Sequence, residues 1–166
     1  MRVTKKVFLV LTLMSFIGLA SALTVLYEFQ ILGNLPPFCT LGGNVMFLGT
    51  PVNCAIVLTS TYSEINIFSL HISLELLAAV WFIINICLVC AISFGRKQYV
   101  STLLDVLFGW RFFGLIIVPY LLYLEFFVVH SICIYCTVMH ACIIIDFIIV
   151  SYFLFSKKTS KYLKMD

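Results

Sequence analysis

Charged residues are scarce in this chain of 166 residues. Only 10% are charged and 63% are hydrophobic, whereas about a quarter of a soluble domain is charged. This number of polar side chains is too small to cover the surface of a water-soluble domain. Most of the chain is therefore expected to face lipid. The net charge is only +3, and the cations do not form a stripe among aromatic residues. Nucleic acid is therefore not an expected partner.

Glycine and proline are also sparse outside one segment. Seven of the twelve lie between positions 33 and 51, which predicts turns there. Elsewhere the chain has four apolar stretches long enough to cross a hydrocarbon core of about 30 Å. These stretches are residues 7–27, 67–94, 112–129 and 135–155. We expect one membrane domain over residues 1–166, an all-α bundle of four transmembrane helices. A long loop at 28–66 should cap it, with a short helix over 54–58.

Lysine and arginine are absent from residues 28–66 and 130–134. All ten lie before the first stretch, between the second and third, or after the fourth: Arg2, Lys5, Lys6, Arg96, Lys97, Arg111, Lys157, Lys158, Lys161 and Lys164. The positive-inside rule predicts a multi-pass protein of the cell membrane with both termini in the cytoplasm and the loop outside. A cleaved signal peptide ending near residues 20–22 is an alternative for the first stretch, although its apolar run exceeds the about 7–15 residues of a signal core.

Cysteine, in contrast, is abundant, with seven residues. Cys133 and Cys136 lie one helical turn apart at the start of the fourth stretch, where a helix N-terminus stabilises a thiolate. This spacing favours a reversible disulfide. Cys39 and Cys54 lie in the loop and can close a second one. Two pairs on one face of a membrane can pass electrons by thiol exchange.

Simpler interpretations exist for several of these residues. The loop pair could be a static staple, and four cysteines could bind zinc, although their spacing suits it poorly and no metal is predicted. Three cysteines deeper in the hydrocarbon are expected only to pack: Cys87, Cys90 and Cys142. Three acids lie within the stretches, and each could relay protons or form a hydrogen-bonded carboxyl between helices: Glu75, Glu125 and Asp146.

Two segments together resemble the vitamin K epoxide reductase family, in particular its prokaryotic members. One is residues 53–65, Asn-Cys-Ala-Ile-Val-Leu-Thr-Ser-Thr-Tyr-Ser-Glu-Ile, followed by Ile67-Phe68, and the other is Cys133-Ile134-Tyr135-Cys136. The resemblance covers about residues 7–155. It implies a four-helix bundle that encloses a quinone of the ubiquinone or menaquinone type, with the loop as a lid. It also implies that the enzyme re-oxidises a separate secreted thioredoxin-like protein that forms disulfides.

The resemblance assigns a role to each cysteine by position. Cys39 would meet the partner protein, Cys54 would exchange with Cys133, and Cys136 would face the quinone. Ser60 matches a hydroxyl-bearing position near the quinone ring. The spacing between the two loop cysteines is longer than in those relatives.

Three further residues are candidates for binding the quinone. His140 lies one turn beyond Cys136 and could hydrogen-bond a quinone carbonyl, or could simply face a neighbouring helix. Asn66 and His71 flank the segment where many bacterial members read Ile-Phe-Gly-Ile-Pro and this chain reads Ile-Phe-Ser-Leu-His.

Two other functions fit part of this pattern. The animal enzymes of the family use thiols to reduce a quinone or vitamin K epoxide, and the same cysteines would serve that direction. A non-enzymatic four-span scaffold would use Cys39 and Cys54 only to staple its loop. That scaffold leaves Cys133 and Cys136 without a purpose.

Overall fold

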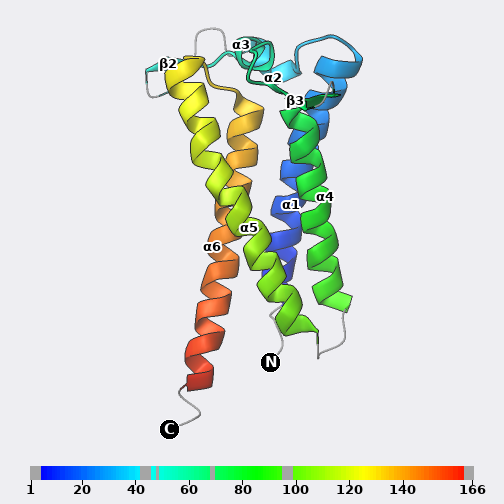
Figure 1. The fold of residues 1–166 in the computed structure, drawn as a ribbon, viewed down its shortest axis with the longest axis vertical. Helices are drawn as coiled ribbons and strands as arrows, with labels where there is room; N and C mark the ends of the chain where they lie inside the picture. The colour runs from blue at the N-terminus through cyan, green and yellow to red at the C-terminus, as the bar shows by residue number, and fades with distance from the viewer. Residues whose placement is uncertain (1–4, 42–45, 48, 68–69, 95–98, 163–166) are drawn as a thin grey trace.

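The computed structural model describes residues 5–41, 46–47, 49–67, 70–94 and 99–162, and its long helices form one bundle (Figure 1). The helices are α1 (Lys5–Val25), continued by the π-helical η1 (Leu26–Ile31), α4 (Leu74–Phe94), α5 (Val100–Tyr123), continued by the π-helical η2 (Leu124–Val128), and α6 (Ile134–Tyr162). Four segments are long and apolar enough to cross a membrane. The predicted four-span helical bundle is confirmed.

A small folded cap, which we define as residues 32–73, lies over the end of the bundle opposite both termini (Figure 1). It contains two short helices, α2 (Pro37–Leu41) and α3 (Cys54–Leu58), and two hairpins, β1 (Met46–Phe47) with β2 (Thr50–Pro51) and β3 (Glu64–Ile67) with β4 (Leu70–Ser73). The predicted helix at 54–58 is confirmed. The segment expected to form only turns also contains α2, whose first residue is a proline, a position where its missing N–H costs no hydrogen bond.

Two spans begin at other residues than the sequence predicts. Helix α4 starts at Leu74 rather than 67, because residues 64–73 form the β3–β4 hairpin, in which Asn66 pairs with His71. Helix α5 starts at Val100 rather than 112. Arg111 interrupts the apolar run in the sequence but does not interrupt the helix, because it is fully buried and paired.

Arg111 belongs to a polar cluster in the middle of the bundle, to which each spanning helix contributes one fully buried residue: Ser15, Asn85, Arg111 and Asp146. We call these residues the buried quartet. Arg111 Nη2 lies 3.4 Å from Asp146 Oδ2, and Arg111 Nε donates to Asn85 Oδ1 at 3.1 Å. Asp146 Oδ2 also accepts from Ser15 and Asn85 at 3.3 and 3.2 Å. The expectation that Arg111 lies outside the spans is therefore wrong, and nine of the ten cations remain as an orientation signal.

Glycines bring the helices close together above and beside the quartet. A Cβ on Gly18 of α1 would collide with the ring of Phe82 on α4. A Cβ on Gly114 of α5 would lie 2.7 Å from Trp81 of α4. Helix α1 thus supplies both Gly18 and Ser15 to the bundle interior, which favours a spanning helix over a cleaved signal peptide.

Towards the cap, α4 and α5 diverge (Figure 1). Trp81 stacks on Trp110 with ring centroids 6.2 Å apart, which joins the two helices at mid-depth. Beyond this contact the π-helical end of α5 and the first turn of α4 lie on opposite sides of a cavity lined by residues of both. The fold therefore holds the bundle tightly in its middle and leaves space beneath the cap.

Candidate active site

The two loop cysteines form a disulfide, as the sequence allows. Cys39 lies in α2 and Cys54 begins α3, and their Cα atoms are 5.2 Å apart. Asn53 caps α3, because its side-chain oxygen accepts from the backbone N–H groups of Ala55 and Ile56 at 3.1 and 3.4 Å. This cap fixes where α3 begins and therefore where the Cys54 sulfur lies.

A short backbone bridge ties the cap to the start of α6. Val52 pairs with Ile132 in parallel, with bonds from Asn53 N to Ile132 O at 3.0 Å and from Ile132 N to Pro51 O at 3.1 Å. Cys54 and Cys133 follow directly on the two sides of this bridge. Both are fully buried and belong to one packed cluster. The loop disulfide and the first thiol of α6 are thus held in the same small volume.

The join between η2 and α6 turns the chain back within a few residues. His130 adopts a left-handed backbone with φ 52°, and its Nδ1 lies 3.1 Å from the carbonyl oxygen of Phe126. Ser131 N donates to Glu125 O at 3.0 Å. As a result Cys133 lies at the N-terminal end of α6. Cys136 follows one turn later, with its backbone N–H directed at the Cys133 sulfur at 3.4 Å, and both thiols are free.

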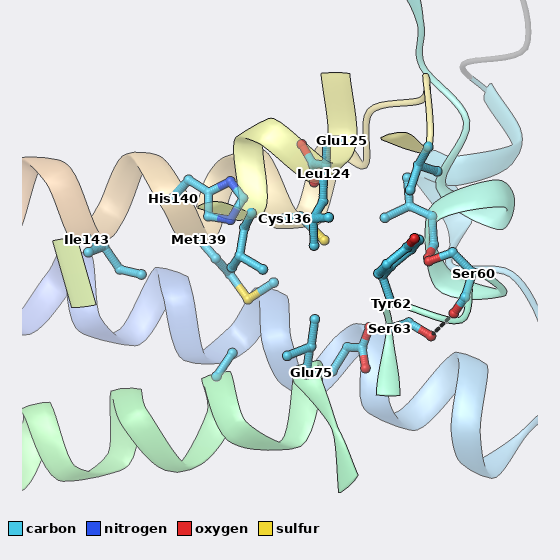
Figure 2. A pocket seen from close by; sticks show the side chains of 15 residues that line it. Ser60, Tyr62, Ser63, Glu75, Leu124, Glu125, Cys136, Met139, His140 and Ile143 are labelled. Atoms are coloured by element: carbon cyan, nitrogen blue, oxygen red, sulfur yellow. Dashed lines mark hydrogen bonds between the residues drawn. The ribbon is translucent and has the colours of Figure 1, made fainter. Parts of the chain in front are cut away.

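A cavity of about 100 Å³ lies beside Cys136, between α4, the η2 end of α5, and α6 (Figure 2). Its lining includes residues from the cap, from the two diverging helices and from α6: Ser60, Tyr62, Ser63, Glu75, Glu125, Cys136, Met139 and His140. Most of the remaining wall is leucine, valine and other aliphatic side chains. An apolar cavity with a few convergent polar groups is typical of a small-molecule site.

Two polar atoms in this wall have no hydrogen-bond partner among the described residues. Glu125 and His140 are only 4% and 6% exposed, and among the described residues neither Glu125 Oε2 nor His140 Nδ1 has a hydrogen-bond partner. The Glu125 carboxyl lies against the Cys136 thiol and the backbone of Cys133. Buried polar atoms are rarely left unpaired, so these atoms point to a polar ligand in the cavity.

A CxxC pair of free thiols thus lies beside such a cavity, and the loop disulfide packs against its first cysteine. Residues 9–151 match the sequence profile of the vitamin K epoxide reductase family. The chain belongs to this family. Comparisons with curated proteins and with solved structures found no significant match. Membership makes the chain a multi-pass membrane oxidoreductase of disulfide and quinone chemistry, because members of this family use quinones and act with thioredoxin-like partners.

Of the four residues predicted to bind the quinone, the structure brings two to the cavity. Ser60 and His140 both line the cavity, and the Ser60 hydroxyl donates to Val57 O at 2.8 Å. Asn66 and His71 pair through their backbones, and their side chains lie outside the described residues. The loop disulfide occupies two of the four thiolates that the zinc alternative needs.

The remaining cysteines do not behave alike. Cys142 is buried against Phe82 and Met139, as a packing residue would be. Cys87 and Cys90 are exposed on the surface of α4, where lipid would surround the bundle. The assumption that both are buried packing residues is therefore wrong, because they lie on a face of α4 that is exposed rather than packed against another helix.

Sequence reasoning missed several residues of the cavity wall. Met139 lies three positions after Cys136, and the helical spacing that identified His140 could have found it. Tyr62 and Ser63 belong to the matched 53–65 segment, but nothing in their spacing marks them as cavity residues. Glu75 and Glu125 were predicted as possible proton relays or hydrogen-bonded carboxyls, and the structure brings both into the cavity wall.

Proposed function

We propose that this protein carries two electrons from a separate secreted thioredoxin-like, disulfide-forming protein to a membrane quinone. The observation that supports the relay best is the joint burial of Cys54 and Cys133 at the bridge between the cap and α6. Thiol exchange requires one sulfur to reach another. A soluble partner cannot enter the bilayer and a lipid-tailed quinone cannot leave it, so two pairs at different depths connect them.

The relay begins at the cap. A thiolate of the partner attacks Cys39, the Cys39–Cys54 bond breaks, and the partner closes its own disulfide. The resulting dithiol reduces the Cys133–Cys136 disulfide through Cys54 and Cys133, which restores the loop disulfide. Phe38 beside Cys39 and Met46 on β1 are exposed, and they give the partner an apolar surface to contact. In this relay, a closed Cys39–Cys54 disulfide together with free thiols at Cys133 and Cys136 would be the state that precedes electron transfer to the quinone.

The cavity residues suit a quinone headgroup. When bound, a quinone supplies the acceptor for two electrons and two protons. His140 Nδ1 would hold a ring oxygen and Met139 would pack against the ring face, while Ser60 lies in the same wall with its hydroxyl donated to Val57 O. The cavity of about 100 Å³ is smaller than the roughly 150 Å³ in which an engineered protein holds benzene. The flexible Met139 and the half-exposed Tyr62 therefore have to move when the ring enters.

The orientation is also part of this proposal. The N and C termini lie at one end of the bundle and the cap at the other (Figure 1). Residues 28–66 contain no Lys or Arg, so the positive-inside rule places the termini in the cytoplasm and the cap outside. A single introduced cysteine in the cap, labelled by an impermeant reagent from the outside of intact cells, tests this placement.

Alanine at the α6 cysteines tests the relay. We expect Cys133→Ala and Cys136→Ala each to abolish quinone-dependent oxidation of thiols in purified membranes, because either change removes half of the pair next to the cavity. Cys90→Ala is the matched control, since Cys90 is exposed on α4 and lies outside the site. Turnover at the wild-type rate in either α6 variant would refute the relay.

Trapping the partner separates this function from the scaffold alternative. In a Cys54→Ala variant, Cys39 has no neighbour to resolve a mixed disulfide with a thioredoxin-like protein. We expect that adduct to accumulate on non-reducing gels, and to disappear in a Cys39→Ala, Cys54→Ala double variant. A scaffold with a stapled loop would trap nothing.

A further inference from the structure

Two buried carboxyl groups face each other across the cavity, and their surroundings differ (Figure 2). Glu125 of η2 and Cys136 lie on one wall, and Glu75 of α4 lies on the other. The two carboxyls are about equally buried, with 4% and 6% of each residue exposed. Both belong to ends of spanning helices at the cap. Depth in the bundle therefore does not separate them, whereas their partners do.

Glu75 is held by its own helix. It lies in the first turn of α4, where its carboxyl interacts with its own backbone N–H and with the side chain of Ser73. The first turn of a helix presents unpaired N–H groups and a partial positive charge, both of which stabilise a carboxylate. Glu75 is thus a capping residue whose carboxyl is held in place by its own helix and Ser73.

Glu125 has different partners, because its carboxyl contacts the Cys136 thiol and the backbone of Cys133 rather than residues of its own helix. It lies at the opposite kind of helix end, in η2, where the chain presents carbonyl oxygens rather than N–H groups. The π-helical turn, closed by Val129 N to Leu124 O at 2.8 Å, leaves both Leu124 and Glu125 buried in the bundle. Short π-helical turns often occur at functional sites. The Glu125 carboxyl contacts the Cys136 thiol, and its Oε2 has no hydrogen-bond partner among the described residues.

We propose that Glu125 carries protons from the Cys136 thiol to the quinone oxygen, an inference that rests on the proposed function. Glu125 touches the reacting sulfur and lines the cavity that would hold the quinone ring. None of the described residues that line this cavity is a lysine or arginine that could take this role. Positioned acids and bases contribute about 10²–10⁴-fold to such proton transfers.

The step balances in protons and electrons. Oxidation of the Cys133–Cys136 dithiol releases two electrons and two protons, and reduction of a quinone to a hydroquinone takes up the same number. The S–H bond of Cys136 breaks as an O–H bond forms on Glu125, and the S–S bond forms between Cys133 and Cys136. Glu125 then gives its proton to a ring oxygen. The second thiol proton follows by the same carboxyl, so Glu125 ends in its starting state.

The first test compares two isosteric variants in a single turnover with a water-soluble short-chain quinone. We expect Glu125→Gln to slow oxidation of the reduced α6 pair roughly 100-fold, and Glu75→Gln to slow it by less than about 5-fold, because Glu75 contacts Ser73 rather than the thiol. Asp105→Asn on the exposed surface of α5 should leave the rate unchanged. A Glu125→Gln rate within about 3-fold of wild type, or equal losses in the two Gln variants, would overturn the proposal.

The second test needs no quinone. Infrared difference spectra between the dithiol and the diamide-oxidised protein should contain a glutamic carboxyl band, because the Glu125 carboxyl loses its thiol neighbour when Cys136 enters a disulfide. We expect this band to be lost in Glu125→Gln, to remain in Glu75→Gln and to shift when wild-type protein carries ¹³C-labelled glutamate. A band that persists in Glu125→Gln would overturn the assignment. If the Glu125→Gln protein does not accumulate in cells, the wild-type protein with ¹³C-labelled glutamate is the test, and the absence of a band that shifts would overturn the assignment.

The two tests also separate this proposal from the one on which it rests. A wild-type protein that fails to pass electrons to any quinone would refute the proposed function. The infrared band would still show whether Glu125 and Cys136 share a proton. Quinone reduction that is intact in Glu125→Gln would instead preserve the proposed function and remove only the role of Glu125.

Discussion

The interior of the bundle contains two groups of ionisable side chains that differ in how they are paired. At mid-depth, Arg111 and Asp146 form an ion pair across two helices and share hydrogen bonds with Ser15 and Asn85, although Asp146 Oδ1 has no hydrogen-bond partner among the described residues. Beneath the cap, Glu125 and His140 are also buried but line a cavity and have no ion-pair partner among the described residues, and each has one atom without a hydrogen-bond partner there. Ionisable residues within a membrane are costly wherever they occur. In this protein, pairing across helices indicates architecture, and an unpaired atom beside a cavity indicates chemistry.

The two groups also differ in which elements hold them. One residue from each spanning helix enters the buried quartet, so the quartet fixes the relative depth of all four helices. The cavity takes its polar residues from the cap, α4, η2 and α6 and leaves open space between them, although the bridge at Val52 and Ile132 and a packed cluster with Cys54 and Cys133 join the cap to the bundle. The middle is therefore the rigid support, and the cap end is the part that can adjust to a ligand and a partner.

The largest effect should come from breaking the quartet on one side only. Asp146→Leu leaves the Arg111 guanidinium buried without its counter-charge, and removal of one member of a buried pair costs about 3–5 kcal/mol. The free energy of unfolding in detergent, measured by denaturant titration, should fall by that amount. The matched Arg111→Leu, Asp146→Leu double variant should recover most of it, because the unpaired charge is gone. If the double variant is as unstable as the single one, charge pairing is not what holds this region together.

A substitution in the cavity wall, in contrast, should weaken quinone binding and leave the stability of the protein unchanged. His140→Leu replaces the imidazole with an apolar side chain of similar size and removes the Nδ1 atom, which has no hydrogen-bond partner among the described residues. We expect KM for the quinone to rise about 10-fold, the equivalent of one hydrogen bond of about 1.4 kcal/mol. The unfolding midpoint should stay close to that of wild type. An unchanged KM together with a large loss of stability would place His140 with the architectural residues.

The four spans and the position of the CxxC could be predicted from the sequence, but the contacts between buried polar residues of different helices could not. Four apolar runs predicted the four spans, because a span depends on local composition. The CxxC at the start of the last run predicted that Cys133 and Cys136 lie one turn apart at the start of α6, because this depends only on helical spacing. Arg111 was misplaced because a charge interrupts a hydrophobic run, and its partner Asp146 lies 35 positions away. No local pattern reports a contact between two helices.

The two glutamates show the same limit within the site. Sequence places Glu75 and Glu125 at similar depths near helix ends, so both were equal candidates for a proton relay. What separates them is the β3–β4 hairpin, which ends at Ser73 beside Glu75, and the π-helical turn that brings Glu125 to Cys136. Both features are irregular backbone, which hydrophobic periodicity does not predict.

The smallest effect should come from Ser60, the residue that resemblance alone first placed near the quinone. Its hydroxyl proton is already committed to Val57 O at 2.8 Å, so only its oxygen lone pairs are left for a ligand. A ring oxygen of a quinone is itself an acceptor, and it gains nothing from lone pairs unless Ser60 first breaks the bond to Val57. We therefore expect Ser60→Ala to raise KM for the quinone only about 2-fold, well below the effect of His140→Leu, at the low end of a neutral hydrogen bond. Steady-state kinetics of the two variants side by side make this comparison. An effect of Ser60→Ala as large as that of His140→Leu would mean that Ser60 redirects its proton into the cavity on binding.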